Sequence, residues 1–237
     1  MKNKLLIVLF IVFIFSIPNY AQERVVGVSY TKTTVDNNFH INKVFYKQTG
    51  RKIPVNEFHK LVKENPNLFL EKEFDQEGNV VRYLYDPNDQ NENRIQAQNK
   101  NIPIKSDFPN FKLTTIERSE IEMKDLEGKL IILRFELFAN DFRFKKHEIQ
   151  ELDKKINASE NKEDIKAIIV FQCSENEVRK GFDLKDSNFE LVANGQNFID
   201  KFGISRFPST LLIDQNGNLI NRFSYSEDII LEEHLKK

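Results

Sequence analysis

The chain contains a single cysteine, Cys173, so its thiol has no partner within the chain. One thiol excludes an internal disulfide, a CxxC redox pair and a thiolate metal cluster. Cys173 follows an apolar run, so it lies just past a predicted buried strand, either as a partly exposed thiol or as a small, semi-buried residue. Glu175 and Glu177 lie close by, and neighbouring carboxylates raise the pKa of a thiol. Cys173 is thus either a weakly reactive thiol, with Arg179 or Lys180 as a nearby cation, or a small residue without chemistry.

The other groups that could do acid–base or metal chemistry are dispersed. No pair of histidines has a ligand spacing such as HxxxH, and we expect neither a metal nor another cofactor. His147 and Glu148 could in principle act as an acid–base pair, but neighbours in a helix point to different faces. We therefore interpret these two, together with Glu136 and Asp141, as parts of solvated faces. The histidines are His40, His59, His147 and His234.

The N-terminus has the layout of a secretory signal peptide. Lys2 and Lys4 form a short positive region, residues 5–15 are continuously apolar, and Ala21 ends a plausible cleavage site. We expect residues 1–21 to be removed and the protein to be exported to the periplasm or cell envelope. The apolar run is short for a membrane span, which needs about 20 residues. An uncleaved anchor is the alternative.

Charged residues are numerous but balanced, with 35 basic and 36 acidic side chains. Loss of residues 1–21 leaves a net charge of about −3. No basic field therefore points to nucleic acid, or to a membrane surface beyond the N-terminal signal.

Residues 22–87 have the pattern of a small α+β domain. Residues 88–106 are rich in Asn and Gln and have few apolar side chains, so they cannot bury enough surface to offset the entropy of ordering. We interpret them as a polar linker and place a domain boundary there. The elements predicted before it are a strand at 43–46, a helix at 55–64 and a hairpin of strands 68–74 and 80–85.

From residue 107 to residue 237, apolar strands alternate with helical patterns, which predicts an α/β fold with a parallel core and a final antiparallel hairpin. The predicted strands are 111–113, 121–123, 130–135, 165–171, 189–192, 209–213 and 219–225. The predicted helices are 142–156, 174–180, 196–202 and a last one from Ser226 to Lys237.

Two sequence blocks in this second region resemble a known family. DFPNFKL at 107–113 and MKDLEGKLIILRF at 123–135 are similar to its opening block, in which PxFxL precedes LxGK and the first core strand. FGISRFPSTLLIDQNGNLI at 202–220 is similar to its closing block, YGVxxxPTxxLIDxxG. The region resembles thioredoxin-like proteins, in the branch of periplasmic thiol–disulfide oxidoreductases and redoxins related to alkyl hydroperoxide reductase. The resemblance implies a central mixed sheet flanked by helices.

The resemblance also implies a WCxxC motif after the first core strand, and the motif is absent. Aligned without gaps, Asn140 and Arg143 occupy the two cysteine positions. Neither side chain can form a mixed disulfide, so dithiol exchange is impossible there. Asparagine is a good helix N-cap, and we expect Asn140 to stabilise the start of the following helix. The single-cysteine motif PxxxTxxC of peroxidases is absent as well.

Pro208 is the strongest remaining feature of the resembled family, where this proline is cis and faces the cysteine pair. The alternative is that Pro208 only shapes the turn before the next strand. If a groove persists, the backbone of Phe207 could pair with an extended peptide, with Phe138 as nearby apolar surface. Two hypotheses follow: a non-catalytic module that binds an unknown peptide or protein partner in the envelope, or a thiol oxidoreductase or peroxidase that uses Cys173.

Overall fold

The computed structural model describes residues 39–90, 102–140 and 144–235. The predicted signal peptide 1–21, most of the predicted linker and Arg143 lie outside these ranges. The predicted division into two domains therefore stays a prediction. Within the described ranges, no helix is both long enough and apolar enough to cross a membrane.

Residues 40–90 form a three-stranded sheet with a helix, as the sequence predicts. The strands lie in the order β1-β3-β2, with β2 and β3 as the predicted hairpin and β1 parallel to β3. The sequence did not predict the parallel pair. Val44, Ile53 and Tyr83 are buried in this region. The elements are β1 (Val44–Tyr46), α2 (Val55–Glu64), β2 (Glu71–Phe74) and β3 (Val80–Tyr85).

The remaining described residues form a five-stranded mixed sheet in the order β10-β9-β6-β7-β8. Strands β6, β7 and β8 are parallel, whereas β9 is antiparallel to both β6 and β10. This confirms the predicted mixed sheet with its final hairpin. The five strands are β6 (Leu130–Glu136), β7 (Ile165–Phe171), β8 (Phe189–Val192), β9 (Ser209–Ile213) and β10 (Leu219–Phe223). A separate hairpin of β4 (Lys112–Thr114) and β5 (Glu120–Glu122) precedes them.

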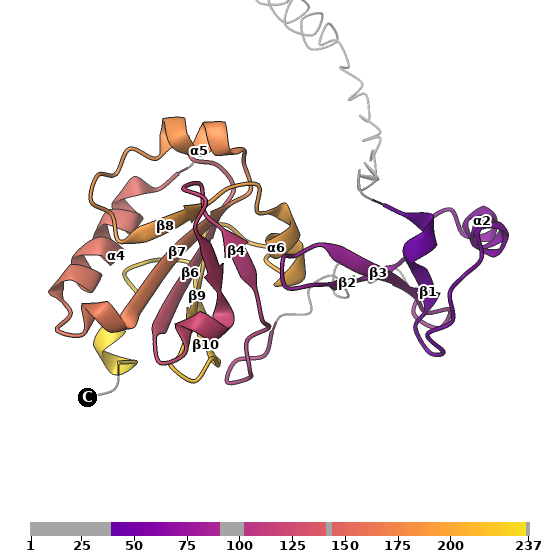
Figure 1. Ribbon diagram of the computed structural model, residues 1–237, viewed down its shortest axis with the longest axis horizontal. Helices are drawn as coiled ribbons and strands as arrows, with labels where there is room; N and C mark the ends of the chain where they lie inside the picture. Colours follow the sequence, from indigo (N-terminus) through magenta and orange to yellow (C-terminus); the bar gives the residue numbers. More distant parts are fainter. Residues whose placement is uncertain (1–38, 91–101, 141–143, 236–237) are drawn as a thin grey trace, which may run out of the picture. The chain divides into compact units, whose positions relative to one another are not determined.

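Helices cover both faces of this sheet, with α4 (Lys146–Ala158) on one side and α6 (Gln196–Lys201) on the other (Figure 1). Alternate residues of β6 supply the two resulting cores. Ile131 and Leu133 pack in the cluster that contains Phe202, while Ile132 packs in the cluster that contains Ile149 of α4. All seven residues of β6 are buried, because the strand lies in the middle of the sheet.

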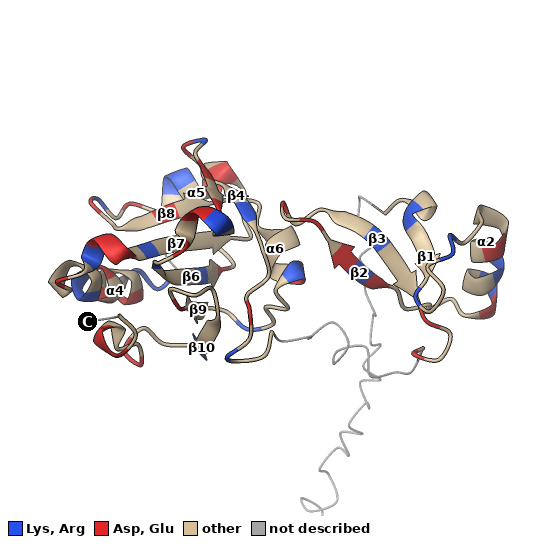
Figure 2. Cartoon of the chain, turned by 60° about the horizontal axis from the view of Figure 1, so that its bottom comes forward, with Lys and Arg blue, Asp and Glu red and all other residues tan. Residues whose placement is uncertain are grey.

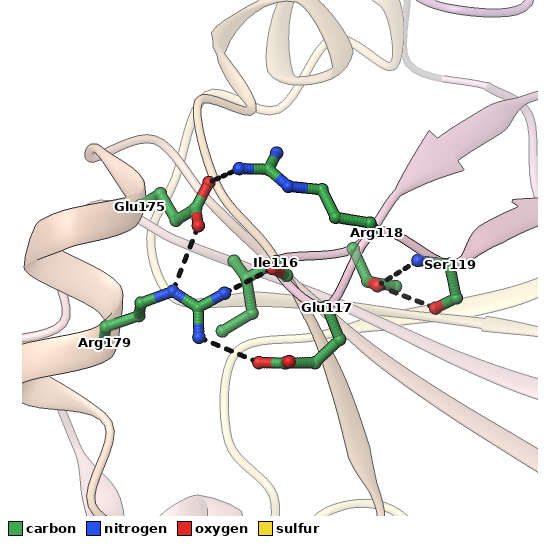
Figure 3. A network of polar contacts seen from close by, with 7 residues as sticks. Ile116, Glu117, Arg118, Ser119, Glu175 and Arg179 are labelled. Atoms are coloured by element: carbon green, nitrogen blue, oxygen red, sulfur yellow. Dashed lines mark hydrogen bonds and ion pairs between the residues drawn. The ribbon is translucent and has the colours of Figure 1, made fainter.

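The α5 helix (Glu175–Gly181) is fixed to the turn that joins β4 to β5. Arg179 donates hydrogen bonds to Glu117, to Glu175 and to the backbone carbonyl of Ile116 (Figure 3). Arg118 forms a 3.0 Å ion pair with the same Glu175. These contacts are at the surface, where single ion pairs contribute little stability, so their effect is mainly to orient α5. Both charge signs are also interspersed along α2 and α4 (Figure 2).

Both hairpin turns with the sequence Asp-Gln-x-Gly-Asn form in the same way. The backbone N–H of Asn79 donates to Asp75 Oδ1 at 2.7 Å, and that of Asn218 donates to Asp214 Oδ1 at 2.8 Å. Gly217 has φ +85°, in the left-handed region that favours glycine. This local chemistry is the reason that the sequence predicted both hairpins.

The prediction of a C-terminal helix from Ser226 to Lys237 is wrong for residues 226–235, which are the described part of that range. Only a short 3-10 turn forms, at Leu231–Glu233. The Ser226 hydroxyl donates to Glu151 on α4 and does not cap a helix. Lys155 of α4 donates to the carbonyls of Ser226, Glu227 and Ile229, which holds this segment irregular against α4. Tertiary contacts therefore override the local helical pattern.

Candidate functional site

The candidate site lies at the sheet edge where β6 ends and β9 begins. Phe135 of β6 and Ser209 of β9 are paired residues in the sheet. Phe138 follows three residues after Phe135, and Phe207-Pro208 comes directly before Ser209. The fold therefore brings to one edge the three residues that the sequence analysis assigned to a peptide groove.

The peptide bond between Phe207 and Pro208 is cis. Phe207 and Phe138 are both half-buried, but they pack against different cores. Phe207 packs against the cluster on the α6 side of the sheet, and Phe138 against the cluster on the α4 side. Each ring therefore has a structural role as well as a partly exposed surface.

The backbone just before Pro208 is available for pairing. Ser205 and Arg206 are exposed. In the part of the chain that the structure describes, the N–H and C=O groups of residues 205–207 take part in no backbone–backbone hydrogen bond. Such a segment can accept an extended peptide by backbone pairing.

Asn140 is not the N-cap residue of α4, contrary to the sequence prediction. The α4 helix begins at Lys146, its N-cap residue is Lys145, and no side chain caps it. Asn140 is exposed, and its carbonyl accepts a hydrogen bond from the N–H of Phe144 at 2.9 Å. The first turn of α4 is therefore held by other groups. Arg143, the second replaced position, is outside the described residues, as are Asp141 and Phe142.

Cys173 is buried, with an exposed fraction of 8%, which agrees with the interpretation as a small residue without chemistry and not with that of a partly exposed thiol. Burial raises the pKa of the Cys173 thiol; the charge of Glu177 raises it further, while a hydrogen bond from the Ala139 backbone lowers it. The α5 helix also approaches closely here, since a Cβ on Gly181 would lie 1.4 Å from the Ala139 carbonyl oxygen. The thiol is therefore enclosed by the backbone that follows β6.

Glu136 and Glu148 are buried, so the interpretation as solvated faces is wrong for both residues. They surround Arg134, whose exposed fraction is 0%. Arg134 Nε donates to Glu136 Oε1 at 2.8 Å, and its Nη2 donates to Glu148 Oε2 at 2.9 Å. Its Nη1 donates to Thr210 Oγ1 at 3.2 Å. Lys145 adds a 3.1 Å ion pair with Glu148 Oε1. We call these five residues the Arg134 cluster.

Arg134 was not predicted as a functional residue, because it stands inside an apolar strand, in LIILRFE. Two features could have indicated the cluster. Residues two apart in a strand share a face, so Arg134 and Glu136 point to the same side. That side also carries Leu130 and Ile132, which are apolar, and a charge on a buried face requires a partner.

The described residues offer no other chemical centre. Within the ranges that the structure covers, no group of three or more His, Cys, Asp or Glu side chains is placed to hold a metal ion. One hollow lies beside the β9–β10 turn near Asp214 and His234. Another lies between α4 and residues 183–186. Neither is lined by Phe138, Phe207 or Pro208.

Replacing Glu136 with glutamine is expected to change how stability depends on pH. Burial raises the pKa of Glu136, although the charge of Arg134 opposes this. The folded wild type therefore retains a proton that the unfolded chain releases, and its stability falls as pH rises from the ordinary glutamate pKa to the raised value. Glutamine does not titrate, so the free energy of unfolding of Glu136→Gln, relative to wild type, should increase over that interval.

Urea unfolding of both proteins at steps from about pH 4 to pH 8 measures this difference. Glu160→Gln, at an exposed position, is the control for removal of a surface carboxylate. A difference between Glu136→Gln and wild type that stays constant with pH would contradict the expectation.

Comparison with known proteins gives a family match and several similar proteins. Residues 104–222 match the AhpC/TSA family. The thiol-disulfide oxidoreductase ResA of Bacillus cereus is 28% identical over 149 residues, which cover 60% of this chain and 82% of the relative. ResA of Halalkalibacterium halodurans is 32% identical over 114 residues, which cover 47% of this chain and 62% of the relative. The solved thioredoxin domain of a thiol-disulfide oxidoreductase from Bacteroides vulgatus, 18% identical, covers 56% of this chain and 99% of its own, with a TM-score of 0.49. Because the family match spans just over half of the chain, this protein, with its thioredoxin-like fold, belongs to the AhpC/TSA family.

Proposed function

We propose that this protein is an exported, non-catalytic member of its family that binds an extended segment of a partner protein. Residues 205–207, which precede cis Pro208, form the binding edge. The observation that carries the proposal is that, among the described residues, the backbone of 205–207 takes part in no backbone–backbone hydrogen bond, because N–H and C=O groups without such partners can add a peptide as a further strand. Phe207 and Phe138 supply partly exposed apolar surface beside that edge.

The cysteine content supports a non-catalytic role. The chain has one cysteine, and Asn140 stands at the end of β6, where the resembled family carries its first catalytic cysteine. Thiol–disulfide exchange begins with attack by a thiolate. No thiolate can form at Asn140, so the proposed activity is binding and not electron transfer.

The alternative, a thiol oxidoreductase or peroxidase that uses Cys173, has less support. A reactive cysteine has a lowered pKa and access to its substrate. Cys173 has a raised pKa and is buried, as described above. Arg179, one of the cations that could have activated it, is instead engaged with Glu175 and Glu117.

Selection from a phage library of random dodecapeptides on the immobilised protein tests the binding proposal. The Kd of a selected peptide can be measured by fluorescence anisotropy. Phe207→Asp should weaken binding by at least about tenfold, because it places a charge beside the pairing edge. Val81→Asp, at an exposed position in the other sheet, is the matched control and should bind as wild type. Failure to select any peptide, or equal affinity for both variants, would count against the proposal.

Alkylation with iodoacetamide at neutral pH tests the alternative. We expect slow labelling of Cys173 in the folded protein and fast labelling after denaturation, because the buried thiol is protonated. Mass spectrometry over time measures both rates. Rapid labelling of the folded protein, together with peroxide or insulin-disulfide reduction that Cys173→Ser abolishes, would support an enzyme instead.

Export is the remaining part of the proposal, and it is supported by the charged and then apolar residues at the N-terminus. Expression of the full chain in a bacterium, followed by mass determination of the protein in each cell fraction, tests it. We expect a mature chain that begins after Ala21 and is found outside the cytoplasm. An uncleaved chain in the cytoplasm would refute export.

A further inference from the structure

We infer that Arg134 is a positioning residue for the proposed binding edge, and that it acts from inside the core without touching the peptide. Its guanidinium joins the start of β9 to the first turn of α4 and thereby fixes the two structures on either side of that edge. This inference rests on the proposed function, because it assigns the residue that holds the same site in place.

The geometry of Arg134 supports this role. Its three donor nitrogens contact acceptors on three different elements: Glu136 on β6, Thr210 on β9 and Glu148 on α4. The planar guanidinium has donors in a fixed fork, so it sets directions as well as distances. With an exposed fraction of 0%, Arg134 cannot reach a ligand itself.

The contact with Thr210 is close to the binding edge. Arg134 and Thr210 are paired residues of β6 and β9, and Thr210 lies two positions after Pro208. Thr210 is itself fully buried. A change in its contact with Arg134 therefore acts at the base of residues 205–207, whose backbone forms no backbone–backbone hydrogen bond with any other described residue.

The contact between Arg134 and Glu148 holds the first turn of α4, on the other side of the binding edge. The α4 helix has no side-chain cap at its N-terminus, so the usual local means of fixing a helix start is absent. Glu148, in the first turn, is instead held by Arg134 from the core and by Lys145 from the rim. The acidic group also suits the positive end of the helix dipole.

The energetics of the cluster favour a role in positioning over one in stability. Removing charges from water is unfavourable, and well-packed apolar residues of similar size are often as stable as a buried ionic cluster. The same sheet face carries apolar Leu130 and Ile132 just before the cluster, so an apolar continuation suits this face. An ionic cluster at this end supplies directional contacts that apolar packing does not.

Arg134→Lys tests the inference, because it keeps the charge but loses the fork. We expect the protein to stay folded, to bind the selected peptide at least about tenfold more weakly, and to exchange the amides of Ser209, Thr210 and residues 147–149 faster. Arg82→Lys is the matched control, since Arg82 forms a two-point ion pair with Glu73 in the other sheet. It should change neither the affinity nor the exchange at those amides.

A triple variant, Arg134→Met with Glu136→Met and Glu148→Met, separates positioning from stability. It replaces all three buried charged side chains of the cluster, so none of them is left buried without a partner. We expect thermal stability equal to or above that of wild type, but the same loss of affinity and the same faster exchange. Thr210→Val removes only the contact between Arg134 and Thr210, with little change of shape, so we expect a smaller loss of affinity and a smaller increase in exchange. It replaces the other two variants if they do not fold.

Unchanged affinity and unchanged amide exchange in the folded variants would overturn the inference. The exchange measurement also separates it from the proposed function. If wild type binds no peptide, the proposed function fails, and faster exchange at Thr210 and the first turn of α4 in Arg134→Lys would still support positioning of this edge. If wild type binds and the variants bind equally well, the function stands and the role of Arg134 is refuted.

Discussion

Strand β6 is the element on which the larger sheet depends. It is hydrogen-bonded to β7 on one edge and to β9 on the other, and its seven residues are buried. A central strand that is covered on both faces must be apolar for most of its length, because unpaired charges there are very unfavourable. Leu130 to Leu133 meet this requirement. The register of β6 then determines where β9 starts, and hence where Phe207-Pro208 lies relative to the residues that follow β6.

The same strand carries the exception to that rule. Arg134 and Glu136 place charges on the α4 side of the sheet, where each has a partner within hydrogen-bonding distance. Two carboxylates face the guanidinium of Arg134 and the ammonium of Lys145, so the formal charges balance. The polar end of this core lies next to the edge at which β6 ends and β9 begins. This edge has a cis proline and, among the described residues, a segment at 205–207 without backbone–backbone hydrogen bonds.

Cys173 illustrates how burial decides chemistry. The sequence places the thiol just past a strand, which is a reasonable position for a reactive group, and its acidic neighbours argue for a raised pKa. The direction of the pKa shift is confirmed, but its main cause is burial and not the neighbouring charge. The backbone of Ala139 and the close approach of Gly181 enclose this region. Access, which the sequence cannot reveal, is what separates an inert thiol from a reactive one.

The sequence by itself determined the elements whose cause is local. Apolar runs predicted β6, β7 and β9, the Asp-Gln-x-Gly-Asn turns predicted two hairpins, and the closing block indicated the family. It also determined that the chain has no internal cysteine pair, since it contains one cysteine. Only the tertiary structure decided the start of α4, the irregular C-terminal segment held by Lys155, and the Arg134 cluster. Those features depend on contacts between residues such as Arg134 and Thr210, which are far apart in the chain and become neighbours only when the strands pair.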